Sequence, residues 1–196
     1  MKRAIFAAIG LFSANAASAA IITYSAILSG ANESPSNNSA ATGMATVLID
    51  DIANTMSLKV MFAGLAGPTT AAHIHCCTAV PFAGNVGVAT ATPSFPGFPA
   101  GVTSGSYNRV FDLMAASTYN TAFITANGGV AGAEAALLAG MAAGKSYYNL
   151  HTSTFPGGEI RGFFVEVPEP GSVALFGLAA AGLMVQRRRK VPGAAH

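Results

Sequence analysis

Short runs in which apolar and polar residues alternate recur through the middle of the chain, and they predict β-strands because successive side chains of a strand point to opposite faces. In residues 55–64, for example, Val60 and Phe62 alternate with Lys59 and Met61. Turn-forming residues separate the runs, notably at 50–54 and in the Pro-Gly-Gly segment 156–158. The predicted strands are residues 22–28, 41–50, 55–64, 72–76, 82–89, 104–112, 147–152 and 159–167.

One segment has a different pattern. Residues 133–139, rich in alanine and leucine, predict a short helix that ends near Gly140 or Gly144. Many short strands with regular turns and a single helix favour an all-β domain, an antiparallel β-sandwich with Greek-key connections. The region 21–167 shows no internal repeat and is long enough for one hydrophobic core, so we expect a single domain there.

The first twenty residues predict a signal peptide. Lys2 and Arg3 precede an apolar run from Ala4 to Phe12, and small residues follow up to an A-x-A cleavage pattern that ends at Ala19. The apolar run is much shorter than the roughly 20 residues that a stable membrane span needs. The alternative is a buried N-terminal helix.

The C-terminal segment predicts a transient membrane anchor. A rigid Pro-Glu-Pro element precedes the short apolar stretch 173–185, and a basic cluster follows it. This order resembles the PEP-CTERM sorting signal, which implies processing by an exosortase in a Gram-negative bacterium that makes extracellular polysaccharide. The alternative is an ordinary tail anchor. The resemblance spans 168–190, with 191–196 as a tail, and its carrying residues are Pro168, Glu169, Pro170, Arg187, Arg188 and Arg189.

The amino-acid composition mainly argues against nucleic acid as a partner. Hydrophobic residues make up 52% of the chain and charged residues only 9%. Six of the ten basic residues lie in the two terminal signals, so region 21–167 holds four basic and seven acidic residues, a net charge of −3. A nucleic-acid-binding domain needs clustered Lys and Arg to neutralise phosphates, so no such partner is expected.

Three segments of the middle region resemble the CHRD domain family, named for chordin. They are residues 24–35 (YSAILSGANESP), 72–75 (AHIH) and 143–162, which contains Tyr-x-Asn-x-His-Thr, Pro-Gly-Gly and Glu-Ile-Arg-Gly. The resemblance implies a β-sandwich similar in shape to superoxide dismutase or an immunoglobulin domain, and it covers residues 22–165.

The histidines are the clearest candidate for chemistry. His73 and His75 are two residues apart on a predicted strand, so both rings would project from one face. If the strand that carries His151 is a neighbour, three imidazoles could bind copper or zinc. Glu159 could add a carboxylate or orient a ring. The alternatives are structural histidines that hydrogen-bond to the backbone, with His151 and Glu159 holding the hairpin at 156–158, and a Glu159–Arg161 pair that serves as a structural ion pair or a turn lock.

Cys76 and Cys77 are the only cysteines of the chain. Cysteines of exported proteins normally pair. Adjacent residues place their Cα atoms about 3.8 Å apart across a trans peptide, below the usual disulfide range of roughly 4.4–6.8 Å. A vicinal disulfide, an intermolecular bridge, free thiols and thiolate ligands for a metal all remain open.

These features favour an exported structural or adhesive protein, sorted by an exosortase and placed at the cell surface or in a polysaccharide matrix. A second hypothesis is a copper- or zinc-binding module built on His73, His75 and His151, for metal storage or redox protection. A third is an oxidoreductase of the superoxide dismutase type, although this chain has fewer histidines than a full copper–zinc site requires. No nucleophile elbow or phosphate-binding loop is present, so no catalytic residue is assigned.

Overall fold

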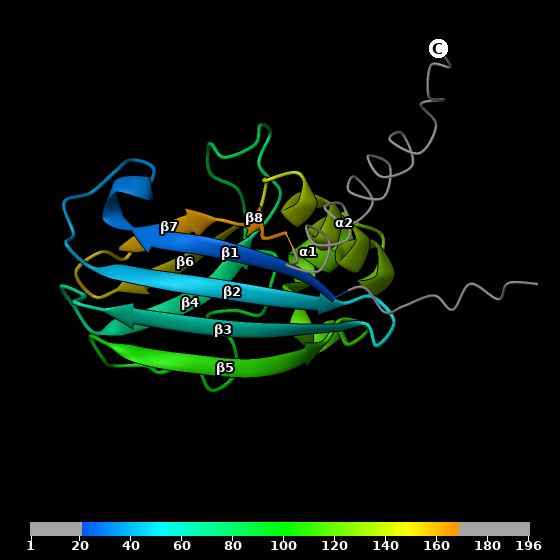
Figure 1. Ribbon diagram of the computed structural model, residues 1–196, viewed down its shortest axis with the longest axis horizontal. Helices are drawn as coiled ribbons and strands as arrows, with labels where there is room; N and C mark the ends of the chain where they lie inside the picture. The colour runs from blue at the N-terminus through cyan, green and yellow to red at the C-terminus, as the bar shows by residue number, and fades with distance from the viewer. Residues whose placement is uncertain (1–20, 169–196) are drawn as a thin grey trace, which may run out of the picture.

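The computed structural model describes residues 21–168 and shows one antiparallel β-sheet of eight strands (Figure 1). The sheet order is β4-β6-β7-β1-β2-β3-β5, and β8 pairs with β1. The strands are β1 (Ile21–Ser29), β2 (Thr42–Asp50), β3 (Thr55–Ala63), β4 (Thr69–His75), β5 (Gly105–Asp112), β6 (Tyr147–Thr152), β7 (Ile160–Phe163) and β8 (Val165–Glu166). The predicted all-β antiparallel fold is confirmed.

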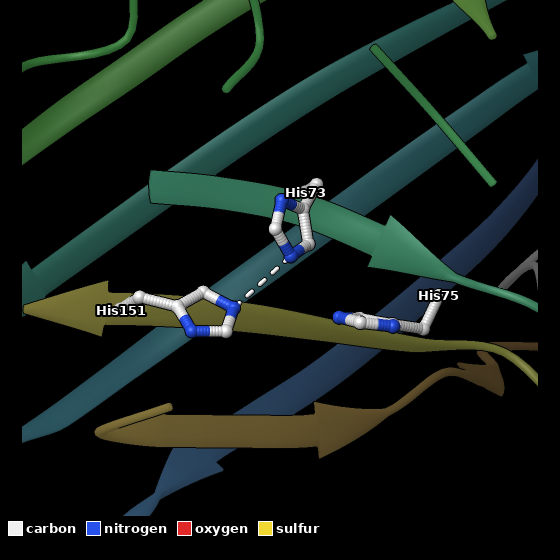
Figure 2. A group of neighbouring side chains, drawn as sticks. All are labelled: His73, His75 and His151. Carbon is white, nitrogen blue, oxygen red and sulfur yellow. Dashed lines mark hydrogen bonds between the residues drawn. The ribbon is translucent and has the colours of Figure 1, made fainter. Parts of the chain in front are cut away.

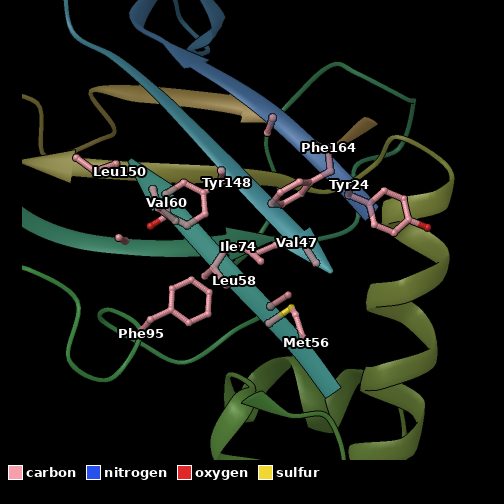
Figure 3. Close-up of a cluster of buried hydrophobic side chains, with 14 of the residues drawn as sticks. Tyr24, Val47, Met56, Leu58, Val60, Ile74, Phe95, Tyr148, Leu150 and Phe164 are labelled. Atoms are coloured by element: carbon pink, nitrogen blue, oxygen red, sulfur yellow. The ribbon is translucent and has the colours of Figure 1, made fainter. Parts of the chain in front are cut away.

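The sheet curls over itself, so that β4 and β6 lie behind β2 and β3 with the core between them (Figure 1). Buried positions alternate with exposed ones in β2 and β3, and the buried set faces inward. Leu58 and Val60 of β3 belong to the same buried cluster as Ile74 of β4 and Tyr148 of β6 (Figure 3). Burial of these apolar faces is therefore what holds the two halves of the sheet together.

Two helices cover one end of the curled sheet (Figure 1): α1 (Thr121–Ala126) and α2 (Val130–Ala142). The predicted helix corresponds to α2, which begins three residues earlier and buries Leu137 and Met141. Helix α1 was not expected, because its sequence TAFITA is rich in residues that favour strands. Asn120 is its N-cap residue, and the Asn120 side chain accepts a hydrogen bond from the Ala122 N–H at 2.9 Å.

The predicted strand at 82–89 is wrong: this segment lies in the long connection from β4 to β5 and makes one isolated bridge, between Val88 and His75. Pro81 precedes the segment, and Gly84 and Gly87 interrupt it, which prevents continuous pairing. Two short 3-10 turns complete the elements, η1 (Gly30–Asn32) and η2 (Ala116–Thr118). The connection runs along β4, the first strand in the sheet order, and so supplies backbone groups next to the two histidines of that strand.

The predicted strand 159–167 is divided into β7 and β8 at Phe164. The Phe164 side chain is fully buried, and its N–H donates to the Ser146 carbonyl rather than to a sheet partner.

Within residues 21–168, no helix is both long and apolar enough to cross a membrane.

Candidate metal centre

Strands β4 and β6 bring three histidines together on the outer face of the sheet. His73 and His75 project from the same face of β4, and β6 pairs with β4 so that His151 lies opposite Ala71. One ring nitrogen from each histidine lies within 4.8 Å of the others. Figure 2 shows the three rings converging, with His73 and His151 in direct contact. The register of two strands separated by more than seventy residues thus creates the cluster.

Each ring is fixed by a backbone carbonyl at its Nδ1 atom. The distances are 3.0 Å from His73 to Pro93, 2.7 Å from His75 to Val86, and 2.9 Å from His151 to Pro156. A carbonyl oxygen only accepts hydrogen bonds, so each Nδ1 must carry the proton. Backbone carbonyls hold metal-ligating histidines in the same way and leave the other nitrogen free to bind.

The Nε2 atoms have no protons left to share. A neutral imidazole carries one N–H, and the three carbonyls use all three of them. Yet His73 Nε2 and His151 Nε2 lie 3.0 Å apart, and His75 Nε2 is buried without a hydrogen-bond partner among the described residues. Three lone pairs therefore face a common point, an arrangement that a bound cation would stabilise.

Burial keeps these rings neutral. His73 and His75 are 6% and 9% exposed. Burial lowers the pKa of His73 and that of His75 to about 4, and it also lowers the pKa of His151. Since a metal binds the neutral ring, the site is in its binding form at neutral pH without first losing protons.

A stack of side chains lies beside His75. The ring of Tyr147 is parallel to that of His75, with centroids 4.6 Å apart, and the Arg161 guanidinium lies 4.8 Å from the centre of Tyr147. The Val86 N–H donates to the Tyr147 hydroxyl at 3.3 Å, and the Val86 carbonyl also receives the His75 proton. Tyr147 and the Val86 backbone therefore fix the His75 ring together.

Sequence reasoning missed Tyr147 as part of this site. The alternation in YYNLHT places Tyr147, Asn149 and His151 on one face of β6, which was the available signal. Nothing in the sequence indicated the three backbone carbonyls that hold the rings, because every residue has a backbone carbonyl.

Glu159 does not belong to the histidine cluster; its carboxylate instead joins β6 to the loops that contain Ser39 and Ala66. Its carboxylate is fully buried and accepts hydrogen bonds from the Ser39 hydroxyl at 2.6 Å, the Ala66 N–H at 2.7 Å and the Thr152 hydroxyl at 2.6 Å. The expected ion pair with Arg161 is also absent from the described residues, where Arg161 contacts Glu33 at 3.8 Å. Glu159 is held by the partners just named, whereas Arg161 donates to the Asn32 and Gly84 carbonyls and to the Asn85 side chain, so the two residues do not meet.

Glu33 is a buried carboxylate. Its side chain is 6% exposed, and one oxygen has no hydrogen-bond partner among the described residues. Burial raises the pKa of Glu33 to about 7, although the nearby Arg161 charge acts in the opposite direction.

Cys76 and Cys77 are joined to each other by a disulfide bond. The bond lies against α2, near the Ala136 carbonyl, and Gly140 leaves room for the two sulfurs. No thiolate is therefore available to the histidine cluster, although β4 ends only one residue before Cys76.

The processing residues predicted from the sequence lie outside the described residues, except for Pro168. These are the cleavage position Ala19 and the sorting residues Glu169, Pro170, Arg187, Arg188 and Arg189.

Comparison with known families supports both the domain and the tail. Residues 24–164 match the CHRD domain, and residues 166–190 match the PEP-CTERM protein-sorting motif. No curated protein and no solved structure matches the chain. The sorting motif marks the protein for exosortase processing and for export to the cell surface of a Gram-negative bacterium. Because the domain match spans most of the chain, the protein belongs to the CHRD domain family.

Proposed function

We propose that this CHRD domain is a transition-metal-binding module displayed outside the cell, with His73, His75 and His151 as ligands through their Nε2 atoms. The observation that supports it is the proton count: three carbonyls hold the three ring protons, and the unprotonated nitrogens face one another. Purely structural histidines would leave the 3.0 Å contact between His73 Nε2 and His151 Nε2 without a proton.

The spacing suits copper or zinc. Metal–nitrogen bonds of about 2.0–2.1 Å place two nitrogens of a tetrahedral site roughly 3.4 Å apart. The His73–His151 pair is already near that value at 3.0 Å, and the third nitrogen lies within 4.8 Å. Imidazole suits both metals. Metal storage or redox protection at the cell surface is the role that follows from such a site.

Metal content of the exported chain, purified without a histidine tag, tests this proposal. We expect about one copper or zinc per chain by elemental mass spectrometry, and its loss in His73→Gln and His151→Gln. The matched control is Asn108→Gln, at an exposed position of β5, the strand at the other end of the sheet order from β4. Circular dichroism confirms that each variant is folded. Absence of metal after incubation with excess copper and zinc would refute the proposal and leave the structural or matrix role.

The proposal also includes a transient anchor in the inner membrane, with the extracellular polysaccharide matrix as the final location. Support comes from the shortness of the apolar stretch 173–185 and the basic cluster behind it. Deletion of residues 171–196 should release soluble protein into the periplasm, as measured by cell fractionation. A truncated chain that stays with the membrane would contradict the anchor.

A further inference from the structure

We propose that the three-histidine centre selects copper and holds it preferentially as Cu(I), an inference that rests on the metal-binding function proposed above. Two features of the described residues lead to it: the charge around the cluster and the number of ligands that it offers.

The cluster has no negative charge to balance a divalent ion. All three ligands are neutral imidazoles, and no described carboxylate or thiolate joins them. The two buried acids of the domain have partners elsewhere: Glu159 is held by Ser39, Ala66 and Thr152, and Glu33 faces Arg161. The guanidinium of Arg161, stacked over Tyr147, adds a positive charge on the His75 side.

Burial makes this imbalance costly. His73 and His75 are almost fully removed from solvent. The cost of transferring an ion from water into such a site grows with the square of its charge, so it is about four times larger for a bare divalent ion than for a monovalent one. Without a protein counter-charge, a monovalent ion is favoured relative to a divalent one.

The ligand number acts in the same direction. Cu(I) is satisfied by three nitrogen ligands in a trigonal arrangement, whereas Zn²⁺ on three histidines takes a water or another external ligand in its fourth position and Cu²⁺ prefers tetragonal geometry. Three histidines meet at this point, and the described residues supply no fourth histidine, cysteine or carboxylate to the group. A divalent ion would therefore need a neutral amide, a water or an external anion as its fourth ligand.

The redox consequence is a raised Cu²⁺/Cu⁺ potential. Bound Cu²⁺ takes one electron from the ascorbate monoanion to give bound Cu⁺, and ascorbate becomes its radical anion as it releases one proton to the solvent. The protein ligands neither gain nor lose a proton in this step, because every ring proton already faces a carbonyl.

Competition titrations on the metal-free exported chain at pH 7 test the inference. Cu⁺ is titrated without oxygen against bicinchoninate, and Zn²⁺ against a chromophoric zinc chelator. We expect the Cu⁺ dissociation constant to be at least about 100-fold smaller than that of Zn²⁺, and ascorbate to abolish the Cu²⁺ electron paramagnetic resonance signal. Equal or tighter Zn²⁺ binding would overturn the Cu(I) inference while leaving the metal site intact, whereas no binding of either ion would refute the proposed function itself.

A variant pair isolates the effect of charge. Ala71 lies on the same face of β4 as His73, opposite His151, and is partly exposed. Ala71→Asp adds a carboxylate beside the cluster, and Ala71→Asn adds a side chain of the same shape without charge. We expect Ala71→Asp to shift the preference toward Zn²⁺ by about tenfold or more relative to Ala71→Asn. An unchanged preference in a folded Ala71→Asp protein would show that charge does not set the selectivity.

Discussion

At the scale of single residues, two buried carboxylates of this protein have different effects on the stability of the fold. Glu159 and Glu33 are both carboxylates withdrawn from solvent, but their surroundings differ. Glu159 receives three hydrogen bonds, whereas one oxygen of Glu33 has no partner among the described residues. The two residues therefore predict opposite mutational outcomes.

Replacement of Glu159 by alanine should lower the free energy of unfolding by about 3 kcal/mol or more, because it leaves buried donors from Ser39, Ala66 and Thr152 without an acceptor. Chemical denaturation measures the change. Glu166→Ala, at an exposed position of β8, is the control and should stay within about 0.5 kcal/mol. A Glu159→Ala protein as stable as that control would contradict the turn-lock role.

Glu33 should make the protein less stable as pH rises. The pKa of Glu33 is about 7 in the folded protein, against the ordinary value of 4.5 that applies to the unfolded chain. Between these two pH values the folded state therefore binds more protons than the unfolded state does. The stabilising contribution is complete below pH 4.5 and is lost as pH rises through 7, by about 2 kcal/mol after solvent screening of this partly exposed group is allowed for.

Glu33→Gln removes this titration. The difference in unfolding free energy between variant and wild type should therefore grow in favour of the variant from pH 4.5 to pH 8. Taking the difference cancels the histidines, which titrate in both proteins. A difference that is constant with pH would show that Glu33 does not carry a raised pKa.

At the scale of elements, the sequence predicted strands well wherever one face is buried. The alternation in residues 55–64 and the turn at 50–54 predicted the β2–β3 hairpin almost to the residue. The strand predicted at 82–89 was wrong because a few apolar residues there resemble a strand, although the neighbouring proline and the glycines prevent pairing. Helix α1 was missed because its propensity favours strand, and only its cap at Asn120 indicated a helix.

The cap gives a direct test of α1. Asn120→Ala removes the side-chain acceptor for the Ala122 N–H and should lower the unfolding free energy by about 1 kcal/mol. Asn108→Ala, at an exposed position of β5, is the matched control and should have little effect. A loss in Asn120→Ala no larger than that of the control would mean that the cap does not stabilise α1.

At the scale of the whole molecule, sequence reasoning could propose the candidate metal centre but could not establish its geometry. The spacing of His73 and His75 indicated a shared face, and His151 was the only other histidine of the domain. Their convergence depends on the pairing of β4 with β6, two strands that no local pattern connects. The orientation of the rings depends on carbonyls from two loops, which carry no signature in the sequence.

Those carbonyls also tie the long β4–β5 connection to the end of the sheet. Pro93 and Val86 lie in this connection, and they hold His73 and His75 of β4. A metal on these rings would act as a cross-link that restrains the loop, because only the ordered state presents all three ligands. Hydrogen exchange of the amides in 86–95 should then slow when copper is added to the wild-type protein, and stay unchanged in His73→Gln.

This restraint of the β4–β5 connection bears on how long the exported domain stays folded outside the cell. A sheet that ends in an unprotected strand offers a template on which other chains can aggregate, and the β4–β5 connection shields that strand here. If bound copper restrains the β4–β5 connection over β4, the extracellular copper concentration sets how well the domain resists proteases and self-association.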